Sequence, residues 1–174
     1  MYEGVMGAAF GRLDAAIQRF HRLRGKHLLR GDVHMEAPAS RAAQVLALCI
    51  GSPRRQQQGA MEFELHANER SEVWIRRFPG HTMTSELKHA GGCLTEKLGC
   101  VQLQFDLEAR DGELSMHLRK LHFWKIPCPK WLMPRVIAEE HGEGDRMMFR
   151  VSAALPFVGT VAAYSGHLVV PVEG

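Results

Sequence analysis

Three residues at alternate positions, Trp74, Arg76 and Phe78, form the first group that could take part in binding chemistry. Residues two apart on a β-strand share a face, so this spacing places a guanidinium group between two aromatic rings. If that face lines the inside of the protein, Arg76 is a buried cation that needs an anion, such as a ligand carboxylate or phosphate. If it faces solvent, Arg76 stacks on exposed ring edges in a cation–π contact. Both interpretations stay open, because the opposite face of this segment is also largely apolar.

A proline-rich segment, residues 126–134 (IPCPKWLMP), contains the large apolar residues Trp131 and Met133. Proline lacks an N–H donor and fixes φ, so we expect a rigid connection outside any hydrogen-bonded ladder. The apolar side chains could close over an apolar ligand at the mouth of a barrel, or they could plug the barrel end. The sequence does not decide between a lid and a plug.

Few residues are candidates for acid, base or nucleophile. We expect Glu140 to point inward near Tyr164, and burial of Lys125 beside a β-bulge would remove its charge, as a Schiff-base lysine requires. The chain has no GxSxG motif and no cysteine with a histidine at a recognisable spacing, so no catalytic residue is assigned. The candidate ligand-binding residues are therefore Trp74, Arg76, Phe78, Trp131, Met133, Glu140 and Tyr164.

Composition excludes several classes of protein. The net charge of +3 is too small and too dispersed for a dedicated nucleic-acid binder. The ten histidines include no HxH, HxxxH or HExxH pattern, so we expect no metal site and no other cofactor. The four cysteines form no CxxC pair, and the N-terminus does not have the pattern of a secretory signal, so we expect a cytoplasmic protein. No apolar run reaches the roughly 18 residues that span a bilayer.

A two-residue hydrophobic period after residue 60 predicts the fold. Apolar and polar residues alternate over residues 101–107, and the Asp111-Gly112 pair before the next alternating run is typical of a hairpin. The phase slips at Arg119-Lys120, which indicates a β-bulge. About ten strands joined by tight turns predict a mainly β (or α+β) protein, an antiparallel meander curled into a barrel or half-barrel.

Two short helices are expected near the N-terminus, within a single domain spanning residues 1–174. Residues 1–24 carry an apolar stripe at Phe10, Leu13, Ile17 and Phe20, which predicts one amphipathic helix. We expect this stripe to pack on the domain's own core, and a membrane surface is not an expected partner. The second helix, at about residues 39–51, begins after an N-cap at Ser40. Its expected apolar face is Ala42, Val45, Leu46 and Cys49, and residues 25–171 form the barrel-like body.

Three segments, residues 74–80 (WIRRFPG), 126–134 (IPCPKWLMP) and 155–168 (LPFVGTVAAYSGHL), together resemble an uncharacterised bacterial family, domain-of-unknown-function family 4166. The resemblance covers roughly residues 15–171 and implies no established activity. Some relatives look like fusions to a saccharopine-dehydrogenase-like nucleotide-binding domain, so the resemblance implies a nucleotide-binding oxidoreductase domain or subunit as a candidate partner. This chain has no GxGxxG motif, so NAD(P) binding is not inherited.

The leading hypothesis is a binding module that holds a small apolar or amphipathic molecule in a β-barrel-like pocket. Small residues expected to leave room in that pocket are Gly31, Ala153, Gly159, Ala163 and Gly166. The alternative is an enzyme acting on a small organic acid or lipid-like substrate, with Arg76 as anion anchor. A third hypothesis, a structural interaction domain, predicts a large exposed apolar patch in place of a pocket.

Overall fold

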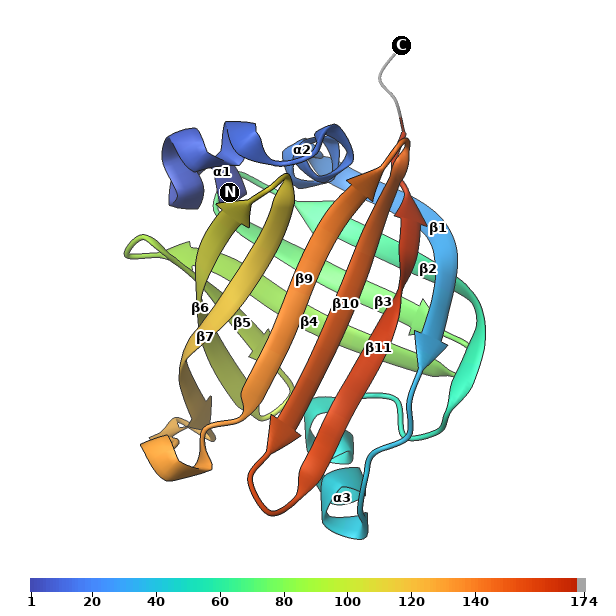
Figure 1. Cartoon of the computed structure of the whole chain (residues 1–174), viewed down its shortest axis with the longest axis vertical. Helices are drawn as coiled ribbons and strands as arrows, with labels where there is room; N and C mark the ends of the chain where they lie inside the picture. Colours follow the sequence, from blue (N-terminus) through green and yellow to red (C-terminus); the bar gives the residue numbers. More distant parts are fainter. Residues whose placement is uncertain (172–174) are drawn as a thin grey trace.

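Within residues 1–171, which the computed structural model describes, ten long strands form a closed antiparallel barrel (Figure 1). The long strands are β1 (Gly25–Met35), β2 (Gln57–Ala67), β3 (Ser71–Phe78), β4 (His81–Ala90), β5 (Cys93–Leu98), β6 (Val101–Arg110), β7 (Glu113–Phe123), β9 (Arg135–Glu143), β10 (Arg146–Leu155) and β11 (Gly159–Val169). Each pairs with the long strand that follows it, and β11 pairs with β1, which closes the ring. The predicted barrel is confirmed, and residues 172–174 of the predicted domain lie outside the described residues.

The local signals in the sequence produce the turns and the bulge where they were expected. Asp111 and Gly112 both have positive φ, 52° and 88°, as a tight hairpin between β6 and β7 requires. Gln104 pairs with Lys120 and Phe105 with Leu118, so Arg119 is the extra residue of a bulge in β7. The bulge lets the inward faces of both strands stay inward along their whole length.

Three short segments, not one helix, make up the N-terminal region. They are α1 (Tyr2–Met6), the 3-10 helix η1 (Gly7–Arg12) and α2 (Ala15–Arg22). The prediction of a single helix over residues 1–24 was wrong because the backbone turns at Gly7, with φ of 56°, and is extended at Leu13 and Asp14. The predicted apolar stripe is nevertheless buried, with each of its four residues at most 4% exposed.

These N-terminal segments cover one end of the barrel, which we call the capped end (Figure 1). Asp14 anchors them there: its backbone N–H donates to the Gly112 carbonyl at 2.8 Å, and its carboxylate accepts from the Gly142 N–H at 2.9 Å. The apolar side chains of the cap, among them Tyr2, Phe10 and Phe20, join the main hydrophobic core inside the barrel. The cap therefore removes this end of the interior from water.

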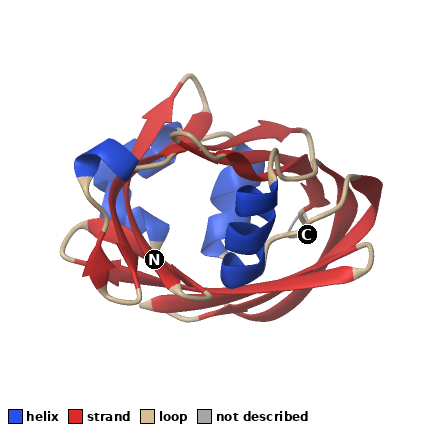
Figure 2. Cartoon of the chain, turned by 90° about the horizontal axis from the view of Figure 1, so that it is seen from below, coloured by secondary structure: helices blue, strands red, loops and turns tan. Residues whose placement is uncertain are grey.

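Helix α3 (Arg41–Ile50) lies at the opposite end, which we call the α3 end, and Figure 2 looks onto it. The Ser40 hydroxyl accepts from the Ala43 N–H, as the sequence predicted, and Gly51 ends the helix with φ of 67°. The predicted apolar face was wrong, because Ala43 and Ala47 are the fully buried residues and Val45 is 63% exposed. Because this helix is apolar nearly all round, its contacts with the barrel, and not its sequence pattern, determine which face is buried.

The other feature of the α3 end is the long connection from β7 to β9. It contains the two-residue strand β8 (Ile126–Pro127), which pairs with β7, and the 3-10 helix η2 (Lys130–Leu132). The three prolines of this connection keep it out of the long ladders, as expected. The α3 end is thus built from α3, this connection and the hairpin turns that join the remaining strands.

Candidate ligand-binding cavity in the barrel

The inner face of the barrel carries the residues that the sequence singled out on β3. Arg76 pairs with Phe63 of β2 and Met83 of β4, and Trp74 pairs with Leu65 and Ser85. These partners are all buried inside the barrel. The face that carries Trp74, Arg76 and Phe78 therefore lies inside the barrel and not towards solvent. These three side chains are 5–7% exposed.

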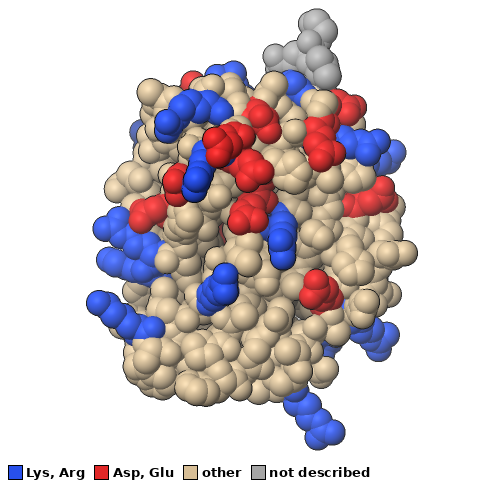
Figure 3. Space-filling view, in the orientation of Figure 1, with Lys and Arg blue, Asp and Glu red and all other residues tan. Residues whose placement is uncertain are grey.

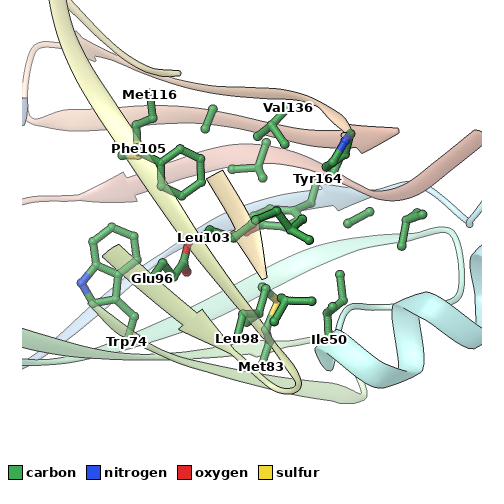
Figure 4. Close-up of a pocket in the computed structure, with 18 of the residues that line it drawn as sticks. Ile50, Trp74, Met83, Glu96, Leu98, Leu103, Phe105, Met116, Val136 and Tyr164 are labelled. Carbon is green, nitrogen blue, oxygen red and sulfur yellow. The ribbon is translucent and has the colours of Figure 1, made fainter. Parts of the chain in front are cut away.

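An interior cavity of about 180 Å³ lies between these residues and the α3 end. Its walls are mostly aliphatic and aromatic side chains from β4 to β11, such as Leu103, Phe105 and Val136, and its lining includes Leu46 and Ile50 of α3. Figure 4 shows Trp74 and Glu96 on one side of the cavity and Ile50 on the other. A smaller space of about 40 Å³, lined by Phe20 among others, extends towards the cap. Arg76, Glu140 and Tyr164 line both spaces.

Arg76 is the buried cation of this cavity, and protein groups already surround it. One terminal nitrogen donates to the Ser85 hydroxyl at 3.2 Å, and the other lies 3.4 Å from a Glu96 carboxylate oxygen. The guanidinium carbon lies 5.0 Å from the ring centroid of Trp74, a cation–π contact. Burial lowers the pKa of Arg76, but the neighbouring Tyr164 and Glu96 outweigh it, so the pKa is raised overall. Arg76 therefore stays charged and has a protein counterion.

Glu140 is a buried carboxylate that lines the same cavity, and it also has a partner. Its side chain lies 2.7 Å from His21 Nε2 of α2, so the cap supplies a polar group to the barrel interior. The ring of His21 stacks on that of Tyr2 with centroids 3.7 Å apart. His21 Nδ1 and the Tyr2 hydroxyl are buried without a hydrogen-bond partner among the described residues.

Tyr164 places a hydroxyl among these groups. Its side chain is buried against the ring of Phe78, with centroids 5.3 Å apart, and it lines both spaces. Burial raises the pKa of Tyr164, although nearby Arg76 lowers it, so the phenol is neutral at physiological pH. Within the described residues this hydroxyl forms no hydrogen bond with protein, which leaves it able to bond to a molecule in the cavity.

Four of the seven residues selected from the sequence line one cavity: Trp74, Arg76, Glu140 and Tyr164. Phe78 supports Tyr164 from the side without lining the cavity. Trp131 and Met133 do not line it, and Trp131 is 70% exposed, so this segment is neither a closed lid nor a plug; its Pro134 lines the cavity instead. Lys125 is exposed, which removes the expected reason for loss of its charge.

Three residues of the site, Glu96, Ser85 and His21, were not predicted from the sequence. The alternation of Leu94, Glu96 and Leu98 was a usable signal, because two buried apolar neighbours place the carboxylate on the inner face. No comparable signal marks His21, since its role depends on how α2 packs on the barrel.

Four of the five small residues expected to leave room do not line the cavity. Only Ala153 of that set lines the cavity. A Cβ on Gly31 would lie 1.7 Å from the His167 carbonyl oxygen, and one on Gly166 would lie 2.0 Å from that of Asp32. These glycines permit close approach of β1 and β11 where the ring closes.

The described residues provide neither a metal site nor a membrane-spanning helix. No group of three or more His, Cys, Asp and Glu side chains is placed to hold a metal ion. No helix in residues 1–171 has the length and apolar character needed to cross a membrane. All four cysteines are free thiols.

The fold and the cavity define a closed antiparallel β-barrel with an apolar interior space and a buried polar cluster. Residues 13–168 match the model of a family described as a domain of unknown function, DUF4166, and the chain belongs to this family. No curated protein matches the chain. The solved structure of Rv2717c from M. tuberculosis is similar, with a TM-score of 0.51 over 92% of this chain and 99% of that one, at 11% sequence identity. At that identity the similarity supports the fold alone.

Proposed function

We propose that this protein binds a small, mostly apolar molecule that carries one neutral polar group. The observation that carries the proposal is the interior cavity of about 180 Å³, whose lining is apolar apart from the cluster of Arg76, Glu96, Glu140 and Tyr164 and the exposed residue Glu139. An apolar cavity of roughly 150 Å³ in a protein core is large enough for a benzene molecule. The class of ligand is therefore a single ring or a short alkyl chain.

The charges of the cluster favour a neutral polar group over an ionised one. Arg76 faces Glu96, and Glu140 faces His21, so both carboxylates already have nitrogen partners. An ionised ligand would add an unbalanced charge to a buried site, which is costly. A ligand hydroxyl or carbonyl could instead bond to the unpartnered hydroxyl of Tyr164. The alternative of an enzyme that holds an organic acid on Arg76 gains no support from this geometry.

The test compares two probes with similar chains, octanol and octanoate, by titration calorimetry and amide NMR of the full chain. We expect octanol to bind more tightly and to shift amides of cavity-lining residues such as Leu103 and Ala162. Tyr164→Phe should weaken octanol binding roughly fivefold, the value of one hydrogen bond of about 1 kcal/mol. Tyr2→Phe is the matched control, because the Tyr2 hydroxyl is buried outside the cavity lining.

Three outcomes would contradict the proposal. One is the absence of binding by either probe. Another is a set of amide shifts that lies outside the barrel interior. Preference for octanoate, lost in Arg76→Met, would instead support the anion-anchor alternative.

A further inference from the structure

Exposed large apolar side chains are concentrated at the α3 end. Of the eight in the described residues, only Leu28 and Val169 lie elsewhere, on strands β1 and β11 near the capped end. The six at the α3 end are Val45 and Leu48 of α3, Trp124, Ile126 and Trp131 of the β7–β9 connection, and Phe157 of the β10–β11 turn. We call these six residues the apolar rim. Phe157 is 97% exposed, and Trp124 and Trp131 are about 70% exposed.

The same end is basic. Its connections, residues 36–56, 79–80, 99–100, 124–134 and 156–158, carry the cations Arg41, Arg54, Arg55, Lys125 and Lys130 and a single carboxylate, Glu36. All five cations are exposed, and none forms a salt bridge within the described residues. On the face shown in Figure 3, acidic side chains gather towards the capped end, and the surface near the α3 end is mostly uncharged with Lys and Arg at its margins.

The capped end provides the contrast. Its segments, residues 1–24, 68–70, 91–92, 111–112, 144–145 and 170–171, contain five acidic and five basic side chains and none of the exposed large apolar ones. The two ends of one barrel thus differ in both properties. A difference of this kind is not explained by the overall composition.

The backbone holds part of the rim in an uncommon conformation. Trp124, Lys125 and Phe157 have φ of 45°, 69° and 64°, and they are three of the four described non-glycine residues with positive φ. Bulky residues avoid this region because of steric conflict with their own backbone. Trp124 and Lys125 are the two turn residues between the paired residues Phe123 and Ile126, where a two-residue hairpin favours positive φ at both positions. Although the ring of Trp124 lies 4.8 Å from that of Phe123, Trp124 and Phe157 both remain mostly exposed in these turns.

From these observations we infer that the α3 end docks on an anionic lipid bilayer. Tryptophan and phenylalanine side chains favour the boundary between headgroups and acyl chains, and clustered Lys and Arg are attracted to anionic headgroups. A second copy of the chain does not fit as well, because two copies facing each other would oppose their unpaired cations. The surface is distinct from the N-terminal stripe, which is buried on the domain's own core. From the sequence a membrane surface was not an expected partner, because only the fold gathers the exposed apolar and basic residues at one end.

Docking would also face the cavity towards lipid, since Leu46, Ile50 and Pro134 at this end belong to its lining. An apolar ligand would then enter the cavity directly from the bilayer. This entry route rests on the proposed function. Docking on the bilayer does not depend on ligand binding. The two ideas are tested separately, because the octanol titration contains no vesicles and the vesicle experiment contains no octanol.

The experiment is co-sedimentation of the full chain with phosphatidylcholine vesicles, with and without phosphatidylglycerol. We expect binding to the mixed vesicles, a blue shift of tryptophan fluorescence, and weaker binding at high salt because the attraction is partly electrostatic. Trp131→Ala with Phe157→Ala should lower the partition coefficient at least about tenfold. Leu28→Ala with Val169→Ala is the matched control, because it also removes two exposed apolar side chains and should leave binding unchanged.

A second pair of variants tests the charges. Lys125→Gln with Lys130→Gln should lower the partition into mixed vesicles roughly thirtyfold, whereas Arg12→Gln with Arg70→Gln at the capped end should not. Because all eight positions are exposed, circular dichroism should confirm folding in each variant.

Four results would overturn the docking inference. They are the absence of sedimentation with either vesicle, equal binding to both, equal losses in the rim variants and their controls, and dimerisation through the rim. Dimerisation, detected as a mass that halves in Trp131→Ala with Phe157→Ala, would make the rim a protein interface, as the structural-domain hypothesis predicted.

Discussion

Filling the cavity should stabilise the protein and abolish ligand binding at the same time. Ala162 of β11 lines the cavity beside Ala153, with which it pairs. At about 24 cal/mol per Å³, an empty space of this size costs about 4 kcal/mol relative to a filled one. Ala162→Leu adds three carbons, which at about 0.8 kcal/mol for each buried methylene recovers roughly 2 kcal/mol.

The assay is thermal and urea unfolding followed by circular dichroism, with octanol titration of the same samples. A gain of about 2 kcal/mol raises Tm by roughly 4–8 °C in a domain of this size. Ala163→Leu is the control, because Ala163 is the next residue on the same strand, its side chain lies on the other face, and it is absent from the cavity lining. We expect little change in stability and normal octanol binding for that variant.

The reasoning would be refuted if Ala162→Leu were destabilised by about 1–3 kcal/mol, the usual cost of overpacking a filled core. It would also fail if Ala162→Leu gained stability and still bound octanol normally, because the probe would then lie elsewhere.

Three further predictions concern the scaffold. Gly31→Ala should destabilise the barrel by more than about 3 kcal/mol in urea unfolding, because its Cβ would lie 1.7 Å from a backbone oxygen of His167, whereas Gly11→Ala, with nothing within 4 Å, should be neutral. Hydrogen bonds from Lys26, Arg77 and His66 lower the pKa of Glu64 from 4.5 to about 2. The contribution of Glu64 to stability is therefore complete above pH 4.5 and is lost as the pH falls through 2. Glu64→Gln should flatten that part of the curve of Tm against pH, and an unchanged curve would contradict this assignment. Ser40→Ala should cost about 1 kcal/mol in the same unfolding assay through loss of the N-cap of α3, and a neutral result would mean that water replaces the cap.

Part of the polar interior could be predicted from the sequence. Trp74, Arg76 and Phe78 were placed on one face, and the inward direction of Glu140 near Tyr164 was expected; the structure brings four of these five to one cavity. The position of Glu96 was available from the alternation around it. That Arg76 faces Glu96 could not be predicted, because the two residues come from β3 and β5, which are not neighbours in the sheet.

The apolar segments that failed did so for a shared physical reason. Helix α3 is apolar on most of its surface, so its sequence allowed more than one buried face, and contact with Val161 at the barrel end selected Ala43 and Ala47. Trp131 and Met133 were expected at a mouth because they are large and apolar, yet hydrophobicity alone does not say which apolar residues a chain buries.

The sequence by itself determined the strands, their turns, the bulge at Arg119 and which residues of a strand share a face. These features follow from a two-residue period and from local backbone preferences. Only the tertiary structure decided which face is inside, that β1 and β11 close the ring through Gly31 and Gly166, and that His21 from the cap meets Glu140. It also decided that the basic residues and the exposed aromatic ones gather at one end. These outcomes depend on contacts between residues distant in the chain, and no local preference encodes them.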